Sequence, residues 1–537
     1  MTNIWWQDAV VYQIYPRSFK DTNQDGIGDI RGIISKLDYL KDLGVNVLWL
    51  CPVYQSPGKD NGYDISNYTD INPEYGTLSD MDNLICQAKQ RDIKIIMDLV
   101  INHTSDQHPW FIKSKDKNSP YRDYYYWKED KGSGPPNNWT GFFGGKTWSK
   151  DPDTGDWYLH LFAKEQPDLN YHHPAVLEEI KAILTFWLDK GIAGFRCDVI
   201  NILWKEPLKN GRSKLILTGS EHYISKQGNH ELLKTLRREV LDHYDCFTVG
   251  ETVFISPDTA RDFCLRRRKE LDMIFSFEHM ETDQVMVKWF KTGFRAKKFF
   301  KVLIKWQKDL PWNANYLENH DQPRSVSRFG NDEDYRVESA KMLAILLLTL
   351  RGTPFIYQGQ ELGMTGFDFK SMEDIRDVES INIDTLAKKL HIPAKLRWKM
   401  IQATSRDHAR TPFQWSDQKN AGFTEGVPWI KVNDNYKHIH AKDQIDDPKS
   451  ILSFYKKLIM LRKELIALRE GSFSPIHYDS NLFIYERKKA EESLLVLLNF
   501  SGHKCTFNIS GQVILTNYDR KIYDGVLNPY EGLILQL

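Results

Sequence analysis

The sequence predicts an α/β protein built on a (β/α)8 TIM barrel, with an inserted loop-rich domain after the third strand and a C-terminal antiparallel β-sandwich domain. Short β-rich runs alternate with amphipathic helical patterns over most of the 537 residues, which is typical of parallel βαβ units. Eight such repeats favour a closed barrel over an open doubly wound sheet. Two intervals between repeats are too long for simple connections, and they predict the added domains.

Each strand is expected where a short apolar run is bounded by turn residues. In chain order the eight barrel strands are expected at residues 9–15, 45–50, 93–100, 194–198, 246–251, 271–275, 314–319 and 354–357. Helices are expected where apolar residues recur at helical spacing, at residues 32–43, 81–91, 175–190, 232–243 and 336–350.

The long intervals define the predicted domains. Residues 105–172 are rich in turns, glycines and aromatic side chains, and residues 360–445 form a second excursion before a helix at 451–468. Short strands are expected beyond residue 469, at 482–487, 493–500 and 533–537. The predicted boundaries are 1–104 for the first part of the barrel, 105–172 for the inserted domain, 173–469 for the second part of the barrel and 470–537 for the C-terminal β-domain.

The composition excludes several classes of partner. Lys+Arg and Asp+Glu number 72 each, so no net charge attracts the chain to nucleic acid or to an anionic membrane. The longest apolar candidate, residues 342–350, is far shorter than the roughly 18 residues of a membrane span. The N-terminal residues do not resemble a signal peptide, and the six cysteines are scattered without metal-ligand spacing. We therefore expect a cytoplasmic protein, a monomer or weak homo-oligomer, with a small-molecule partner.

Four of the predicted strands end in polar groups that an apolar strand does not need for folding. These ends lie within residues 98–103, 194–198, 248–251 and 318–321. A single Asp at such a position is more often a helix N-cap. Four strand ends that converge on one barrel mouth indicate an active site instead.

Two of these carboxyl groups suit glycoside hydrolysis, which needs one carboxylate to attack and one carboxylic acid to protonate the leaving oxygen. Asp198 is expected to be the ionised group, because Arg196 lies on the same face of the strand and a guanidinium lowers the pKa of a nearby carboxyl. Glu251 has no basic residue at that offset, so it is expected to stay protonated and act as the acid.

In order and spacing, the four strand ends resemble the signature regions of the α-amylase superfamily, glycoside hydrolase family 13. Residues 60–64 and 166–170 further resemble its oligo-1,6-glucosidase subgroup, and the resemblance spans essentially the whole chain. It implies a retaining enzyme in which Asp198 is the nucleophile, Glu251 the acid/base and Asp321 the transition-state stabiliser. It also implies a terminal-glucose subsite lined by Asp60, Tyr63, His103, Phe162, Arg196, His320 and Arg410.

Val199, which directly follows the expected nucleophile, bears on linkage preference. Its plainest interpretation is a β-branched residue that packs the strand end. Relatives that prefer α-1,6 bonds typically carry Val at this position, whereas those that prefer α-1,4 bonds usually carry Ala or Thr. The sequence therefore predicts an exo-acting α-glucosidase that releases glucose from short α-glucosides and prefers α-1,6 linkages, as in isomaltose, isomalto-oligosaccharides and panose.

Other functions stay open at this stage. Trehalose-6-phosphate hydrolases share nearly all of these motifs, and activity on sucrose or on α-1,4 glucosides is a further alternative. A non-catalytic role, as in the barrel subunits of amino-acid transporters, is disfavoured because those subunits carry a membrane helix and lack the catalytic carboxylates.

An acidic loop near the N-terminus predicts a metal site away from the chemistry. Residues 21–29 place oxygen ligands at alternate positions with a glycine at the sixth, as in the first half of a calcium loop, although the twelfth position is Gly32 rather than Glu. The plain alternative is an acidic surface turn. The resemblance implies a structural Ca²⁺, with no metal needed for hydrolysis itself, and as its ligands Asp21, Asn23, Asp25, Asp29 and the carbonyl of Ile27.

Overall fold

The computed structural model describes residues 4–285 and 287–537. Its centre is an eight-stranded parallel sheet in the order β11-β10-β9-β5-β2-β1-β15-β14. All eight strands overlap the predicted ranges, which confirms the barrel. They are β1 (Val11–Ile14), β2 (Val47–Leu50), β5 (Lys94–Leu99), β9 (Gly194–Cys197), β10 (Phe247–Glu251), β11 (Met273–Phe275), β14 (Ala314–Asn315) and β15 (Thr353–Tyr357).

The barrel strands are buried on both faces, as expected for a parallel sheet covered by helices. β11 and β14 stand at the two ends of the hydrogen-bonded order. The ring of Phe275 in β11 contacts that of Tyr316, just past β14, with centroids 5.2 Å apart, and this contact completes the barrel. The seventh strand is shorter than predicted, because the chain turns into a loop in which Asn319 Oδ1 accepts from the backbone N–H of Asp321 at 2.8 Å.

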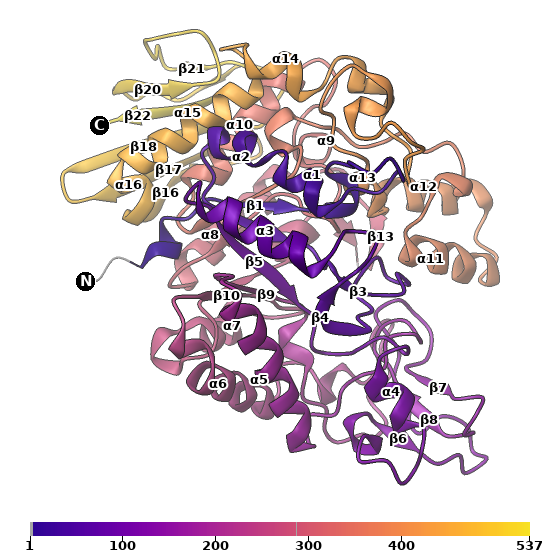
Figure 1. Cartoon of the computed structure of the whole chain (residues 1–537). Helices are drawn as coiled ribbons and strands as arrows, with labels where there is room; N and C mark the ends of the chain where they lie inside the picture. Colours follow the sequence, from indigo (N-terminus) through magenta and orange to yellow (C-terminus); the bar gives the residue numbers. More distant parts are fainter. Residues whose placement is uncertain (1–3, 286) are drawn as a thin grey trace.

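Helices surround the barrel (Figure 1). The predicted helix at 32–43 is two helices, since the hydroxyl of Ser35 donates to the Gly32 carbonyl at 2.7 Å and competes with the helical pattern. The helix predicted at 232–243 begins earlier and ends at Glu239. The helices are α1 (Ile30–Ile34), α2 (Leu37–Leu43), α3 (Leu78–Lys89), α5 (Pro174–Asp189), α6 (Gln227–Glu239), α7 (Pro257–Cys264), α8 (Ala296–Asp309), α9 (Ser325–Phe329) and α10 (Arg336–Thr349).

Small antiparallel sheets and short helices are inserted between barrel strands. After β5 the chain forms α4 (Pro109–Ser114) and a three-stranded sheet of β6 (Trp127–Lys128), β8 (Trp157–Leu159) and β7 (Trp148–Lys150). Two further pairs are β3 (Tyr54–Gln55) with β4 (Asn67–Ile71), and β12 (Gln284–Val285) with β13 (Val287–Lys291). The segment after β15 carries α11 (Val378–Lys389), α12 (Ala394–Thr404), α13 (Asp407–Arg410) and α14 (Ala441–Ile445).

The C-terminal region is an antiparallel β-domain that follows α15 (Ile451–Glu464) and α16 (Ile466–Glu470). The predicted helix at 451–468 is broken at Leu465, whose backbone is extended. One face of the five-stranded sheet packs on the barrel helices, where Phe483 stacks on Phe300 at 4.7 Å. The sheet consists of β16 (Ser472–Tyr478), β17 (Leu482–Lys489), β18 (Glu492–Asn499), β22 (Gly532–Gln536) and β20 (Gln512–Thr516).

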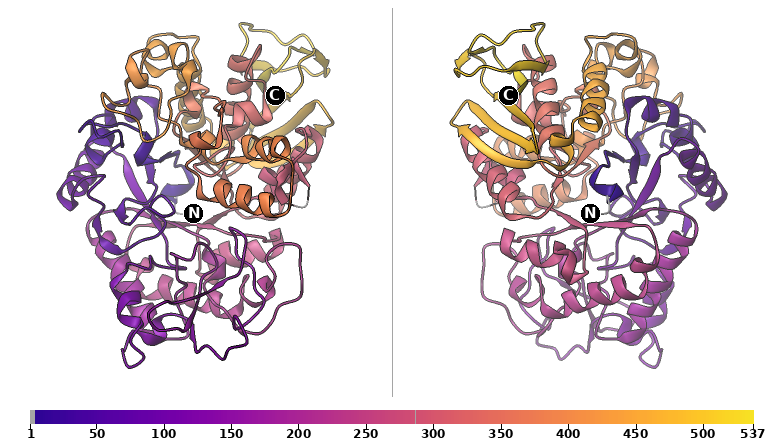
Figure 2. Two further views of the ribbon diagram at one scale, coloured as in Figure 1. Left: turned by 90° about the vertical axis from the view of Figure 1, so that its right-hand side faces the viewer. Right: turned by 90° about the vertical axis from the view of Figure 1, so that its left-hand side faces the viewer.

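The second layer of the predicted sandwich is a single pair, β19 (Cys505–Thr506) and β21 (Val526–Leu527). Leu527 from this pair joins the apolar cluster on the outer face of the larger sheet. The C-terminal sheet and the inserted segment lie at opposite ends of the molecule (Figures 1 and 2). Among the described residues, no helix has the length and apolar character needed to span a membrane.

Candidate active site

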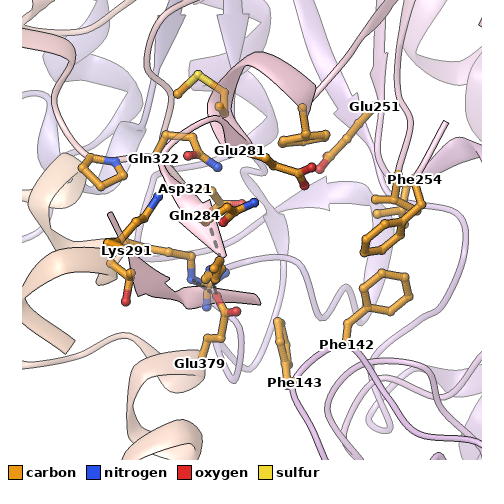
Figure 3. A pocket seen from close by; sticks show the side chains of 18 of the residues that line it. Phe142, Phe143, Glu251, Phe254, Glu281, Gln284, Lys291, Asp321, Gln322 and Glu379 are labelled. Carbon is orange, nitrogen blue, oxygen red and sulfur yellow. Dashed lines mark hydrogen bonds and ion pairs between the residues drawn. The ribbon is translucent and has the colours of Figure 1, made fainter. Parts of the chain in front are cut away.

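The three carboxylates that the sequence analysis singles out stand at the ends of barrel strands. Asp198 directly follows β9, Glu251 is the last residue of β10, and Asp321 lies in the loop after β14. Glu251 and Asp321 line a cavity of about 230 Å³ at the barrel mouth (Figure 3), and Asp198 is buried. Groups far apart in the sequence share one site because the carboxyl ends of all barrel strands meet at one face.

A single guanidinium joins three carboxylates. Arg196 donates from Nη1 to Asp98 Oδ1 at 2.6 Å and to Asp198 Oδ1 at 2.7 Å, and its Nη2 contacts Glu251 Oε2. Glu251 has no basic residue at the same offset along its own strand, as expected, but β10 pairs with β9 and brings Glu251 beside Arg196 of the adjacent strand. Asp198 and Glu251 are therefore held at the same guanidinium.

Burial dominates the protonation of the groups in this site. Removal from water raises the pKa of Asp198 to about 6, and Arg196 opposes this shift without cancelling it. The expectation of a lowered pKa for Asp198 was wrong in its net direction. Burial also lowers the pKa of His103 to about 4 and that of His320 to about 3. Both imidazoles are therefore neutral near pH 7 and present one donor and one acceptor each.

Asp321 lies among cationic side chains. Burial alone would raise its pKa, but attraction to His320, which is protonated only at low pH, and to Arg406 and Arg410 outweighs burial and lowers it. Arg410 Nη2 donates to Asp321 Oδ1 at 2.6 Å, and Arg410 Nε donates to the His320 carbonyl at 3.0 Å. Asp321 is thus held as an ionised acceptor in contact with Arg410.

Tyr63 and His320 form a stacked pair. Their ring centroids are 5.4 Å apart, and Tyr63 Oη lies 2.6 Å from His320 Nε2. Gln13 Nε2, from β1, lies 2.8 Å from His320 Nδ1, so both ring nitrogens have a partner. Gln13 was not predicted as a site residue. It is a polar residue inside an otherwise apolar strand, and this pattern could have indicated a role in the site.

Arg406 is the main residue that the sequence analysis missed. Its Nε donates to Asp377 Oδ1 at 2.7 Å, and its Nη2 lies 3.3 Å from Asp60 Oδ1. Burial raises the pKa of Asp60 to about 7, although Arg406 and Arg410 pull it down. Arg406 lies only four residues before Arg410 in the sequence, but it was not predicted as a site residue.

The inserted segment supplies one side of the site. Phe162 lies with its ring centroid 5.2 Å from that of His103. Gln166 Nε2 lies 3.1 Å from His103 Nε2 and 3.4 Å from Asp60 Oδ2. The predicted residues of the glucose subsite are thereby brought together from the barrel, the inserted segment and the loop after β15.

Val199 and Phe162 both line the cavity. The backbone of Val199 adopts a left-handed conformation (φ 34°, ψ 42°), which is rare for a β-branched residue. The cavity has an aromatic wall and a polar wall. Figure 3 shows Phe142, Phe143 and Phe254 on one side of the cavity and, on the other, Lys291, Gln322 and Glu379. The polar wall was not predicted, because its residues belong to no motif that was recognised.

The predicted calcium loop is shaped by its own carboxylates. Asp21 Oδ1 accepts from two backbone N–H groups of the loop at 2.8 and 2.9 Å, and Asp25 Oδ1 accepts from Ile27 N at 2.8 Å. Asp29 caps α1 by accepting from Gly32 N at 2.6 Å. Carboxylate and carbonyl oxygens are the donors that calcium prefers. In the described parts of the chain, no three or more His, Cys, Asp or Glu side chains gather closely enough to hold a metal, so the calcium stays a prediction.

Comparisons with known proteins agree with this geometry. The alpha-amylase catalytic domain family matches residues 13–471. An oligo-1,6-glucosidase from Parageobacillus thermoglucosidasius is 48% identical over 560 aligned positions, with 100% of both chains covered.

Solved structures are similar over nearly the whole chain. A trehalose-6-phosphate hydrolase from Bacillus licheniformis is 43% identical with a TM-score of 0.94, over 99% of this chain and 100% of that one. An isomaltulose synthase mutant from Erwinia rhapontici is 42% identical with a TM-score of 0.95, over 100% of this chain and 99% of that one. The chain therefore belongs to the alpha-amylase family, glycoside hydrolase family 13, and is a glycoside hydrolase of the α-glucosidase/oligo-1,6-glucosidase type.

Proposed function

We propose that this enzyme is a retaining, exo-acting α-glucosidase that releases glucose from the non-reducing end of short α-glucosides and prefers α-1,6 linkages. Its substrates would be isomaltose, isomalto-oligosaccharides and panose. The observation that carries the proposal is the Arg196 guanidinium, which contacts both Asp198 and Glu251 beside the cavity at the barrel mouth. Two carboxyl groups that contact the same guanidinium suit a double displacement.

In this mechanism Asp198 attacks the anomeric carbon while Glu251 gives its proton to the leaving oxygen. The bond to the leaving group breaks as the Asp198–glucosyl ester forms. Glu251, now a carboxylate, then takes a proton from water, which displaces Asp198 and yields α-glucose. Asp321 is an ionised acceptor for the hydroxyls near the reacting carbon, where binding strengthens in the transition state.

Exo-action is supported by the contacts at one side of the site. The Arg406–Asp60 pair and the Gln166–His103 contact join loops from distant parts of the chain. If these contacts close the inner end of the pocket, it would accept the end of a chain but not its middle. Glucose should therefore be the first product from short oligosaccharides.

The charges at the mouth support a neutral substrate over a phosphorylated one. A phosphate would need cationic side chains with uncommitted charge. Lys288 pairs with Glu379 at 2.5 Å, whereas Lys291 and Arg328 contact Asp283 at 2.7 and 2.8 Å. The cavity lining as a whole carries four basic side chains (Lys288, Lys291, Arg328 and Arg406) and four acidic ones (Glu251, Glu281, Asp321 and Glu379). The lining therefore offers a phosphate no surplus of positive charge, which favours uncharged sugars.

A substrate panel tests the proposal. Purified protein would be assayed on isomaltose, panose, maltose, sucrose, trehalose and trehalose 6-phosphate, with products separated over time. We expect the highest kcat/KM on isomaltose or panose, with glucose released first. The highest value on trehalose 6-phosphate would replace the proposed substrate, and maltose released from a polymer would contradict exo-action. An initial β-anomer in the NMR spectrum would contradict retention.

We further propose that Ca²⁺ binds Asp21, Asn23, Asp25, Asp29 and the Ile27 carbonyl in a structural role. The loop is joined to the segment after the barrel, because the Thr424 hydroxyl donates to Asp21 and Trp429 N donates to the Gly26 carbonyl at 3.0 Å.

We also propose a cytoplasmic enzyme that acts as a monomer or weak homo-oligomer. All six cysteines lie within the described ranges and are unpaired there. This state is usual in a reducing compartment.

A further inference from the structure

Phe254, three residues after Glu251, has an unusual backbone and an unusual environment. Its φ is 50°, in the left-handed region that bulky residues rarely adopt. Its side chain is 57% exposed, so core packing does not account for this conformation. Backbone strain of this kind is concentrated at functional sites, where the surrounding structure holds it in place.

The ring of Phe254 is the outermost of three aromatic rings. Phe162, beside His103, stacks on Phe142 with centroids 4.7 Å apart and an interplanar angle of 8°. Phe142 in turn lies 6.5 Å from Phe254, at 31°. The three rings lead from the glucose subsite to the mouth of the cavity, and Figure 3 shows Phe142 and Phe254 side by side.

We propose that Phe254, backed by Phe142, is a stacking platform for the sugar ring of the leaving group and thus determines leaving-group specificity. The inference rests on the proposed glucosidase function and names a residue that recognises the second sugar. Glu251, the proton donor to the leaving oxygen, lines the same cavity as Phe254. A leaving ring bound in this cavity could therefore reach Phe254.

The chemistry of a pyranose suits this platform. Its C–H faces are apolar, and covering the exposed part of a phenyl ring with them removes apolar surface from water. The cavity lining also includes Glu281, Gln284 and Gln322, whose polar groups suit the hydroxyl edge of the ring. A sugar between the two walls would have both its apolar face and its polar edge matched.

The test compares two substrates with the same glucosyl group. Isomaltose has a leaving sugar, whereas α-glucosyl fluoride leaves only fluoride, which is too small to stack. Phe254→Gly removes the ring and suits the positive φ. We expect its kcat/KM to fall about ten-fold more on isomaltose than on α-glucosyl fluoride, a loss typical of an aromatic contact. Phe254→Tyr keeps the ring and should restore the wild-type ratio.

Two controls separate recognition from folding. Phe290, 48% exposed in β13, is outside the cavity lining, so Phe290→Ala should not change the substrate ratio. The melting temperature of Phe254→Gly should not fall, because glycine relieves the backbone strain. If Phe254→Gly leaves the ratio of kcat/KM on isomaltose to that on α-glucosyl fluoride unchanged, whatever its melting temperature, the platform is overturned. Absence of glucosidase activity in the wild-type enzyme would instead overturn the proposed function.

Discussion

Arg406 Nη2 lies 3.3 Å from Asp60 Oδ1, although the two residues are 346 positions apart in the chain. Arg406 Nη1 also lies 3.4 Å from Asp321 Oδ1. One guanidinium therefore links Asp60 to Asp321, the residue proposed to bind the hydroxyls near the reacting carbon. The long segment after β15 thus contributes directly to the active site.

The roles of the two catalytic carboxyl groups differ in their dependence on the leaving group. Glu251→Gln should reduce kcat/KM severely on isomaltose, whose leaving oxygen needs a proton, and much less on an activated aryl α-glucoside. Asp198→Asn is the matched variant and should abolish turnover on both, because no glucosyl ester can form. Equal losses on the two substrates for Glu251→Gln would argue against its role as the acid.

Burial of Asp198 predicts the acid side of the pH profile. Its pKa of about 6 means that the nucleophile becomes protonated as the pH falls through about 6, so kcat/KM on isomaltose should fall about ten-fold per pH unit below that value. The folded state binds this proton more tightly than the unfolded chain, so protonating Asp198 does not itself destabilise the fold. Melting temperatures measured across the same range would confirm this. A decline centred near pH 4 would show that Asp198 is unperturbed.

The barrel could be predicted because the sequence carries its pattern locally. The strands are short apolar runs, and the polar residues that end them are adjacent in sequence to those runs. Features that depend on neighbouring strands could not be read in this way. The contact of Arg196 with Glu251 exists because β9 and β10 pair in parallel, and no spacing along one strand encodes it.

Burial explains a prediction that was wrong, the direction of the pKa shift of Asp198. Sequence spacing placed Arg196 near Asp198 and gave the correct sign for that one interaction. The net shift of the Asp198 pKa depends on how much water the fold excludes, which the sequence does not state. The polar wall of the cavity illustrates the same limit, since Lys288 and Glu379 come from segments without a recognised motif and meet only in the folded chain.

The calcium proposal predicts an effect on stability rather than on chemistry. A chelator should lower the melting temperature, because an ion bound only to the folded state stabilises it by about 2.7 kcal/mol at 100 times its Kd. Activity at low temperature should largely survive. Asp25→Asn should lower the melting temperature and make it insensitive to the chelator. Loss of activity at an unchanged melting temperature would show that the structural assignment is wrong.

Linkage preference is predicted to depend on Val199. This residue is 5% exposed, and its left-handed backbone brings it to the cavity wall that also carries Glu251 and Phe254. Its γ-methyl groups would narrow the second subsite and disfavour a ring attached directly through a secondary hydroxyl. A 6-linked ring has an additional rotatable C5–C6 bond and can move clear of them. We therefore expect higher kcat/KM on isomaltose than on maltose.

Replacing Val199 should shift that preference. A methyl-sized steric difference is worth roughly 1–3 kcal/mol, or about 10- to 200-fold in discrimination. Val199→Ala should raise the maltose-to-isomaltose ratio of kcat/KM within that range. Val199→Thr keeps the branched shape but exchanges one methyl for a hydroxyl, so it tests whether polarity as well as size sets the preference, and it should also shift the ratio towards maltose. If Val199→Ala leaves the ratio unchanged, then Val199 only packs the strand end, and linkage specificity must reside in other residues of the cavity.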